Sequence, residues 1–209
     1  MAFGILPLLA LAALPSGGQA IGDAANWLHA SDFPTTEWHM AAVTRYDLMV
    51  DDKGTPVNCA ITASSGSPVI DTVVCKSLME RARYSPARDS TGKPIAQAIR
   101  GRLEWHPDTS GQNEHRITAD LSVKTPALAR NAASVSVRLV VIYDPAGAVE
   151  QCIVIKPGRP AKFNKEACTA AVRQGVFPPV KDATGQTTRG LREIEVLFSY
   201  GRNLNVTAL

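Results

Sequence analysis

The chain lacks the residue patterns by which hydrolases and metalloproteins are usually recognised. It contains no Gly-x-Ser-x-Gly pattern, which gives no support to a serine nucleophile of the hydrolase type. It has no Cys-x-x-Cys pair and no paired histidine spacing, which argues against a zinc site. Its histidines, at positions 29, 39, 106 and 115, lie outside the cores of the two repeats described below. We therefore predict no catalytic residues, no cofactor and no metal, and expect a protein that is not an enzyme.

Clusters of basic residues and long apolar runs are also missing. The 22 basic and 19 acidic residues are scattered along the chain, so nucleic-acid binding gains no support. The apolar run near the N-terminus, residues 3–14, is well short of the ~20 residues that a helix needs to cross a bilayer. It is followed by small residues up to Ala20, which is typical of an export signal, although no Lys or Arg precedes it.

We expect residues 1–20 to be a signal peptide. Two alternatives remain open: an uncleaved N-terminus that contacts the inner membrane, and a true start upstream of Met1. The mature chain would then work in an envelope compartment, which we take to be the periplasm.

The residues that are present show an internal repeat. Cys59 and Cys75 recur as Cys152 and Cys168 at one constant offset of 93 residues, because 152 − 59 and 168 − 75 are equal. Turn-forming residues obey the same offset, among them Asp51 with Asp144, Gly54 with Gly147, Asp89 with Asp182 and Gly92 with Gly185. The chain is therefore predicted to contain one module written twice.

Each copy predicts the order strand, strand, helix, strand. In the first copy, alternating residues 45–50 lead into a turn that ends at Gly54, and residues 57–61 form the return strand. Ser67 and Pro68 predict the start of a helix over residues 69–83, whose apolar stripe is Ile70, Val74, Leu78 and Ala82. Residues 97–105 form the third strand. We also expect an extra strand within residues 117–123 and a short helix over residues 35–43.

One cysteine pair in each copy predicts two disulfides, Cys59–Cys75 and Cys152–Cys168. Three connectivities are formally possible for four cysteines, and buried free thiols are a further alternative. Each predicted bond would close a loop of about 15 residues and stabilise the module by roughly 3 kcal/mol.

The first copy resembles the C-terminal domain of the energy transducer TonB, especially a cysteine-bearing subgroup. The resemblance rests on Gly54-x4-Cys59, the Ser-Ser-Gly-Ser run that ends at Ser67, Asp71-x3-Cys75, and residues 81–89 with Gly92. The second copy departs from this pattern: Pro157-Gly158-Arg159-Pro160 replaces the serine run, Asn164 replaces Asp71 and Val180 replaces Ala87.

The resemblance implies an α+β fold of two tandem modules, each a three-stranded antiparallel sheet packed on one helix. We place the modules at residues 31–106 and 134–201, joined by a linker at 107–133. It also implies that the last strand of each module accepts an extended peptide of an outer-membrane transporter or another envelope protein as an added strand. The implied peptide-binding edges are Arg100, Gly101, Arg102, Leu103, Glu104 and Trp105 in the first module and Arg192, Glu193, Ile194, Glu195 and Val196 in the second.

A complete transducer also carries a membrane anchor and a long proline-rich spacer, and we find neither pattern. We therefore expect a periplasmic peptide-binding protein linked to energy-dependent transport rather than a working transducer. The alternatives are a structural or cell-wall-associated module that contacts peptidoglycan, and a full transducer with a misassigned start. In the structural alternative, the two edges bind each other or are covered by the linker.

Overall fold

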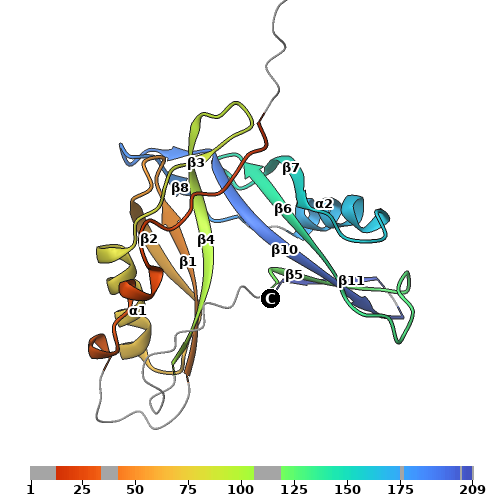
Figure 1. Cartoon of the computed structure of the whole chain (residues 1–209), viewed down its shortest axis with the longest axis horizontal. Coiled ribbons are helices and arrows are strands. Elements are labelled where there is room, and N and C mark those ends of the chain that lie inside the picture. Colours follow the sequence, from red (N-terminus) through yellow and green to blue (C-terminus); the bar gives the residue numbers. More distant parts are fainter. Residues whose placement is uncertain (1–12, 34–41, 106–118, 175–176, 203, 209) are drawn as a thin grey trace, which may run out of the picture.

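The computed structural model describes residues 13–33, 42–105, 119–174, 177–202 and 204–208. Within these residues the chain is a mixed α+β protein, mostly sheet with two α-helices (Figure 1). Two short 3-10 helices, Ala24–Trp27 and Ala30–Asp32, precede the first strand.

The first copy contains the predicted elements in the predicted order. Strand β1 (Ala42–Val50) and strand β2 (Pro56–Ala63) form a hairpin, followed by helix α1 (Pro68–Arg81), the short strand β3 (Ala87–Arg88) and the long strand β4 (Pro94–Trp105). Strand β1 pairs antiparallel with β2 on one side and with β4 on the other, so β1 is the central strand.

The second copy repeats this arrangement. Its elements are β6 (Val135–Tyr143), β7 (Val149–Lys156), α2 (Lys162–Gln174), β8 (Val180–Lys181), β9 (Thr187–Thr188) and β10 (Gly190–Tyr200). Strand β6 is again central, between β7 and β10. The bounds of β6, β7 and β8 are those of β1, β2 and β3 displaced by the same 93 residues that separate the cysteine pairs, as 135 − 42, 149 − 56 and 180 − 87 show.

The repeated turns are held by the same hydrogen bonds in both copies. Asp51 Oδ1 accepts from the backbone N–H groups of residues 53 and 55, and Asp144 Oδ1 accepts from those of residues 146 and 148. Gly54 and Gly147 have φ of 91° and 87°, a conformation that glycine adopts without steric cost. The aspartates and glycines therefore recur in both copies because each turn needs the same acceptor and the same positive φ.

Helix α1 begins as the sequence predicts. Ser67 is the N-cap, its side chain accepts from the N–H of Ile70, and Pro68 occupies the first turn. The helix ends at Arg81, two residues before the predicted end, because Ala82 is already extended and Tyr84 N–H donates to Gly54 O. Helix α2 ends at Gln174, and residues 175 and 176 lie outside the described part of the chain.

The segment before the first strand differs from the prediction of a short helix. Strand β1 already begins at Ala42, so the last two residues of that predicted helix are extended, and residues 35–41 lie outside the described residues.

The two three-stranded sheets are joined into one nine-stranded sheet. Strands β4 and β10 pair in parallel through Ala96 with Gly190 and Gln97 with Leu191. Strand β5 (Leu121–Thr125), from the linker, then pairs in parallel with residues 196–200 of β10, and β11 (Asn205–Ala208) pairs with β5. The extra linker strand therefore exists, but it begins later than predicted. Figure 1 shows β4 and β10 diverging from their contact.

Each copy packs its helix on one face of its own sheet, and the other copy covers part of the opposite face. The predicted α1 stripe, Ile70, Val74, Leu78 and Ala82, is fully buried in the first core with residues of β1. On the helix-free face, Met49, Ala96 and Ala98 join the core of the second copy. Conversely, Ala87 and Ile95 pack against Val140, Ile142 and Leu191 of the second copy. The junction between the copies is therefore an apolar core.

Candidate functional site

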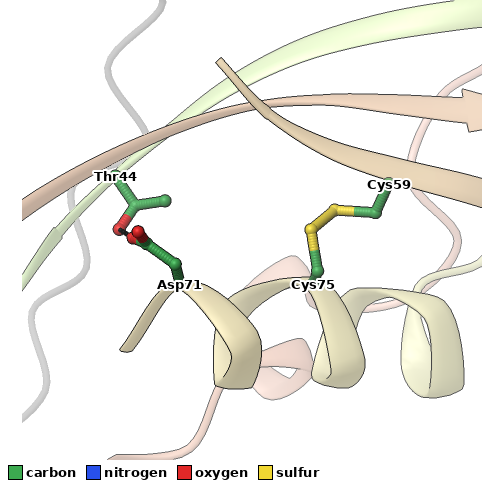
Figure 2. The surroundings of a disulfide bond; sticks show 4 residues. All are labelled: Thr44, Cys59, Asp71 and Cys75. Carbon is green, nitrogen blue, oxygen red and sulfur yellow. Dashed lines mark hydrogen bonds between the residues drawn. A yellow bond between two sulfur atoms is a disulfide. The ribbon is translucent and has the colours of Figure 1, made fainter. Parts of the chain in front are cut away.

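The cysteines form the two predicted disulfides. Cys59 of β2 is bonded to Cys75 of α1, and Cys152 of β7 is bonded to Cys168 of α2. The Cα–Cα distances are 5.6 Å and 5.8 Å, within the usual range for a disulfide. Figure 2 shows the first bond crossing from the sheet to the helix. Both bonds are compatible with an oxidising compartment, and no described helix has the length and apolar character needed to cross a membrane.

The residue four positions before the helical cysteine anchors the loop that leads into the helix. Asp71 accepts a hydrogen bond from Thr44 Oγ1 at 3.0 Å (Figure 2). It also accepts one from Ser65 N–H at 2.9 Å. Burial raises the pKa of the Asp71 carboxyl, but hydrogen bonds from Ser64, Ser65 and Thr44 outweigh it, so the pKa is lowered. In the second copy Asn164 Oδ1 accepts from Gly158 N–H at 2.8 Å. Asn164 thus replaces Asp71 in sequence and performs the same local contact.

A buried cluster of charges lies where the two copies and the linker meet. Arg192 of β10 is 3% exposed, and its guanidinium contacts Asp47 of β1 and Asp120 of the linker. Arg100 of β4 also contacts Asp47, at 3.0 Å. Asp120 in addition exchanges hydrogen bonds with the backbone of Glu195. Two arginines and two aspartates therefore balance one another inside the junction.

The predicted peptide-binding edge of the second copy is partly occupied within the chain. Val196 pairs with Leu121 of β5, and the backbone N–H and C=O of Glu195 are bonded to Asp120. Arg192 is buried in the charge cluster, and the residue before it, Leu191, pairs with Gln97 of β4. The linker covers the end of this edge, because β5 pairs with residues 196–200 of β10. The open-edge prediction is therefore corrected for Glu195 and Val196, whereas residues 192–194 lie between the ladder to β4 and the ladder to β5.

The predicted edge of the first copy differs. Residues 100–105 of β4 pair with residues 42–47 of β1 on one side. On the other side no strand of the described residues pairs with them, because the ladder to β10 ends at Gln97. Arg102 is ion-paired with Glu104 at 2.5 Å, and Leu103 is buried under α1. For Trp105 only the backbone is described, and it lies opposite Ala42.

A cleft of about 310 Å³ lies between the diverging strands β4 and β10. One wall is residues 98–101 of β4, and the other is residues 193–195 of β10. Consecutive residues of a strand point to opposite faces of the sheet, so a wall made of consecutive residues is the edge of the strand itself. Trp27 and Tyr84, whose rings are 5.1 Å apart, line the α1 side of the cleft.

The segment at residues 16–21 lies along the same cleft and had no structural prediction beyond the signal peptide. Ser16 and Arg88 exchange two backbone hydrogen bonds of 2.9 Å, and Ser85 N–H donates to Gln19 O at 2.8 Å. Ile21 N–H donates to Arg83 O at 2.8 Å. Residues 16–21 are therefore an extended segment antiparallel to residues 83–88.

Chemical groups for metal binding are not assembled in the described residues, which contain no group of three or more His, Cys, Asp or Glu side chains arranged to hold an ion.

No family model, no curated protein and no solved structure matches the chain.

Sequence reasoning missed the charge cluster and the contacts of residues 16–21. The partners of Arg192 lie 145 and 72 residues away, so no local pattern indicates them. A signal did exist for the N-terminal segment, because Gly17 and Gly18 are adjacent glycines, which allow a close approach to another backbone.

Proposed function

We propose that this chain is an exported, periplasmic binding protein that accepts an extended peptide by strand addition on the edge of β4 that faces away from β1. The observation that carries the proposal is the ending of the β4–β10 ladder at Gln97, which leaves residues 98–105 paired on the β1 side alone among the described residues. An unpaired strand edge presents a row of backbone N–H and C=O groups that pair with any extended segment in register.

The cleft supports this site because it makes the edge reachable. Residues 98–101 line it from both faces of the sheet, so their backbone groups face the open space. The polar residues around it carry both signs, with Arg100 and Arg138 beside Glu193 and Glu195. Backbone pairing therefore supplies the binding energy, and these charges select the flanking side chains of the peptide.

The resemblance of the first copy to the TonB C-terminal domain supports the class of partner. It favours the exposed terminal peptide of an outer-membrane transporter or another envelope protein, and it links the chain to energy-dependent transport. The disulfides are compatible with this compartment. In the second copy β5 already pairs with residues 196–200 of the last strand, so the proposal assigns one peptide site to the chain rather than two.

Titration of the isotopically labelled chain with a panel of transporter N-terminal peptides tests the proposal. We expect the amide resonances of residues 98–105 to shift, and those of β10 residues 196–200 to stay unchanged because they are already paired. A panel that shifts no amide between residues 98 and 105 would contradict it.

Crosslinking in cells gives an independent test. A photoreactive residue at Arg102, on the proposed edge, should capture a transporter or another envelope protein. Val69 is a matched control, because it is 56% exposed and lies on helix α1 rather than on a strand. Equal capture from both positions would show surface encounter rather than strand addition.

A second candidate is a structural, cell-wall-associated module, and one observation favours it. Residues 190–191 of β10 pair with β4 and residues 196–200 pair with β5. These backbone groups are therefore not available to pair with a peptide. In this case isolated peptidoglycan should retain the protein while the peptide titration fails. Retention together with shifts at residues 98–105 would favour the peptide-binding function.

A further inference from the structure

The segment at residues 16–21 is itself an added strand. It lies antiparallel to residues 83–88, next to β3, which has β4 as its partner on the other side. Its N–H groups have acceptors: Ser16 donates to Arg88 O, Gln19 to Ser85 Oγ, and Ile21 to Arg83 O. The side chains of Ser16, Gln19 and Ala20 are exposed. The contact is therefore made through the backbone of the segment.

Two side chains accept hydrogen bonds from the backbone N–H groups of the two glycines. Gly17 N–H donates to Glu193 Oε1 of β10 at 3.0 Å, and Gly18 N–H donates to Gln97 Oε1 of β4 at 2.9 Å. These acceptors come from different copies, and they meet because β4 and β10 pair at this point. The site is thus built by the junction of the two modules.

The lack of space for a Cβ at the two glycine positions makes the site selective for glycine. A Cβ at position 18 would lie 1.9 Å from the backbone oxygen of Ser85 and 2.6 Å from Gln97 Nε2. A Cβ at position 17 would lie 2.9 Å from Glu193 Oε1, the end of a flexible side chain that is able to move. The second position therefore requires glycine, whereas the first prefers it.

The same site holds an unused polar atom. Gln97 is 3% exposed and lines the cleft, and its Nε2 has no hydrogen-bond acceptor among the described residues. A buried donor without an acceptor is costly. A ligand that extends into the cleft and presents a carbonyl oxygen to Gln97 would satisfy it.

We propose that residues 83–88, with Gln97 and Glu193, form a second peptide site that binds an extended segment with two consecutive glycines. Residues 16–21 are its resident occupant in the full chain. When residues 1–20 are removed, as we expect for the exported protein, the site takes a Gly-Gly segment of another envelope protein. This site uses residues 83–88 and not the β4 edge at 98–105, so it stands or falls separately from the proposed function.

The test is competition between the resident segment and a free peptide. The peptide has the sequence of residues 14–21, Leu-Pro-Ser-Gly-Gly-Gln-Ala-Ile, and binding is followed by the amide shifts of residues 83–88. In the full wild-type chain, the tethered segment acts at a millimolar effective concentration and weakens binding of the peptide by competition. In full-length Gly18→Val, the clash with Ser85 displaces the segment, and the peptide should bind about tenfold more tightly than to wild type.

Two controls bound the interpretation. Gln19→Ala changes an exposed side chain of the same segment and keeps its backbone bond to Ser85, so its peptide affinity should equal that of wild type. A peptide with alanine in place of the second glycine should not bind any variant. A folded Gly18→Val chain without shifts at residues 83–88, or equal binding of the alanine peptide, would overturn the proposal.

A measurement on existing contacts covers the case in which Gly18→Val does not fold. In the wild-type chain the amides of Gly17, Gly18 and Gln19 should exchange slowly with solvent, because each has an acceptor. Ser85→Ala removes the Oγ acceptor and should speed the exchange of Gln19. Rapid exchange of the backbone amides of Gly17, Gly18 and Gln19 in the wild-type chain would overturn the proposal.

Discussion

Arg192 Nη2 lies 3.3 Å from Asp47 Oδ1, although the two residues are 145 positions apart in sequence. Asp47 belongs to the central strand of the first copy, and Arg192 belongs to the last strand of the second. The same Nη2 is 3.1 Å from Asp120 Oδ1 of the linker. One guanidinium therefore connects all three parts of the chain.

We predict that Arg192→Ala is strongly destabilising. It leaves the buried carboxylates of Asp47 and Asp120 with one cation fewer, and breaking a buried pair in this way costs about 3–5 kcal/mol. Arg138→Ala is the matched control, because its pair with Glu193 is about one third exposed and should contribute under about 1 kcal/mol. Urea unfolding of both variants measures the difference. Equal, small losses would show that the cluster contributes little to stability.

Each disulfide is predicted to stabilise its own copy. Replacing Cys59 and Cys75 together by alanine removes a crosslink between residues 16 positions apart, which should lower the free energy of unfolding by roughly 3 kcal/mol. The same replacement of Cys152 and Cys168 should cost a similar amount, because the sequence separation is the same. Wild-type protein should show no alkylated thiol by intact mass without reductant. Four labelled cysteines in exported protein would contradict the bonded state.

The sequence predicted what depends on nearby residues. The Asp51 turn, the Ser67 cap and the cysteine pairs involve partners within about one turn or one supersecondary unit, so their spacing carries the information. The joining of the copies could not be predicted in this way. Residues 192–196 have the alternation of any strand, and whether their edge stays open depends on β5, which enters from a segment 75 residues earlier.

The candidate site likewise has one part that the sequence predicted and one part that it did not. The resemblance placed peptide binding on the third strands, and the cleft does lie between these strands. The contribution of residues 16–21 was missed, since a segment predicted to be removed carries no expectation of a fold. Gly18 has no local role in the segment, and the close approach of Ser85 O that requires glycine comes from a segment distant in sequence, residues 83–88.

The loop anchor before α1 gives a prediction that uses the divergence between the copies. Asp71→Asn should retain the acceptor for Ser65 N–H, because Asn164 makes the equivalent contact to Gly158. Asp71→Ala leaves the N–H of Ser65 and the hydroxyl of Thr44 without this acceptor and should cost about 1–2 kcal/mol more than the asparagine variant. Thermal or urea unfolding compares the two. A larger loss for asparagine would show that the charge, rather than the acceptor, matters.

The contact between Asp32 and Arg81 predicts an acid-sensitive step. The hydrogen bonds from Arg81 outweigh the opposing effect of burial and lower the pKa of the Asp32 carboxyl from 3.8 to about 2. A lowered pKa in the folded state means that the stabilisation is complete above the unfolded pKa and is lost as the pH falls through the folded one. The stability difference between wild type and Asp32→Asn should thus be constant above pH 4 and shrink towards pH 2. A difference that persists unchanged at pH 2 would contradict this assignment.

The two glycine turns allow backbone strain to be separated from crowding. Gly54 and Gly92 have φ of 91° and 81°, so an alanine at either position is strained by roughly 1 kcal/mol. At Gly92 a Cβ would meet no atom within 4 Å, whereas at Gly54 it would lie 1.9 Å from the backbone oxygen of Tyr84. Gly54→Ala should therefore lose clearly more stability than Gly92→Ala. Tyr84 is one of residues 83–88, which form the site proposed for a Gly-Gly segment. Only Gly54→Ala should therefore also shift the amide resonances of residues 83–88. Equal shifts from both variants would mean that the contact between Gly54 and Tyr84 does not position the site.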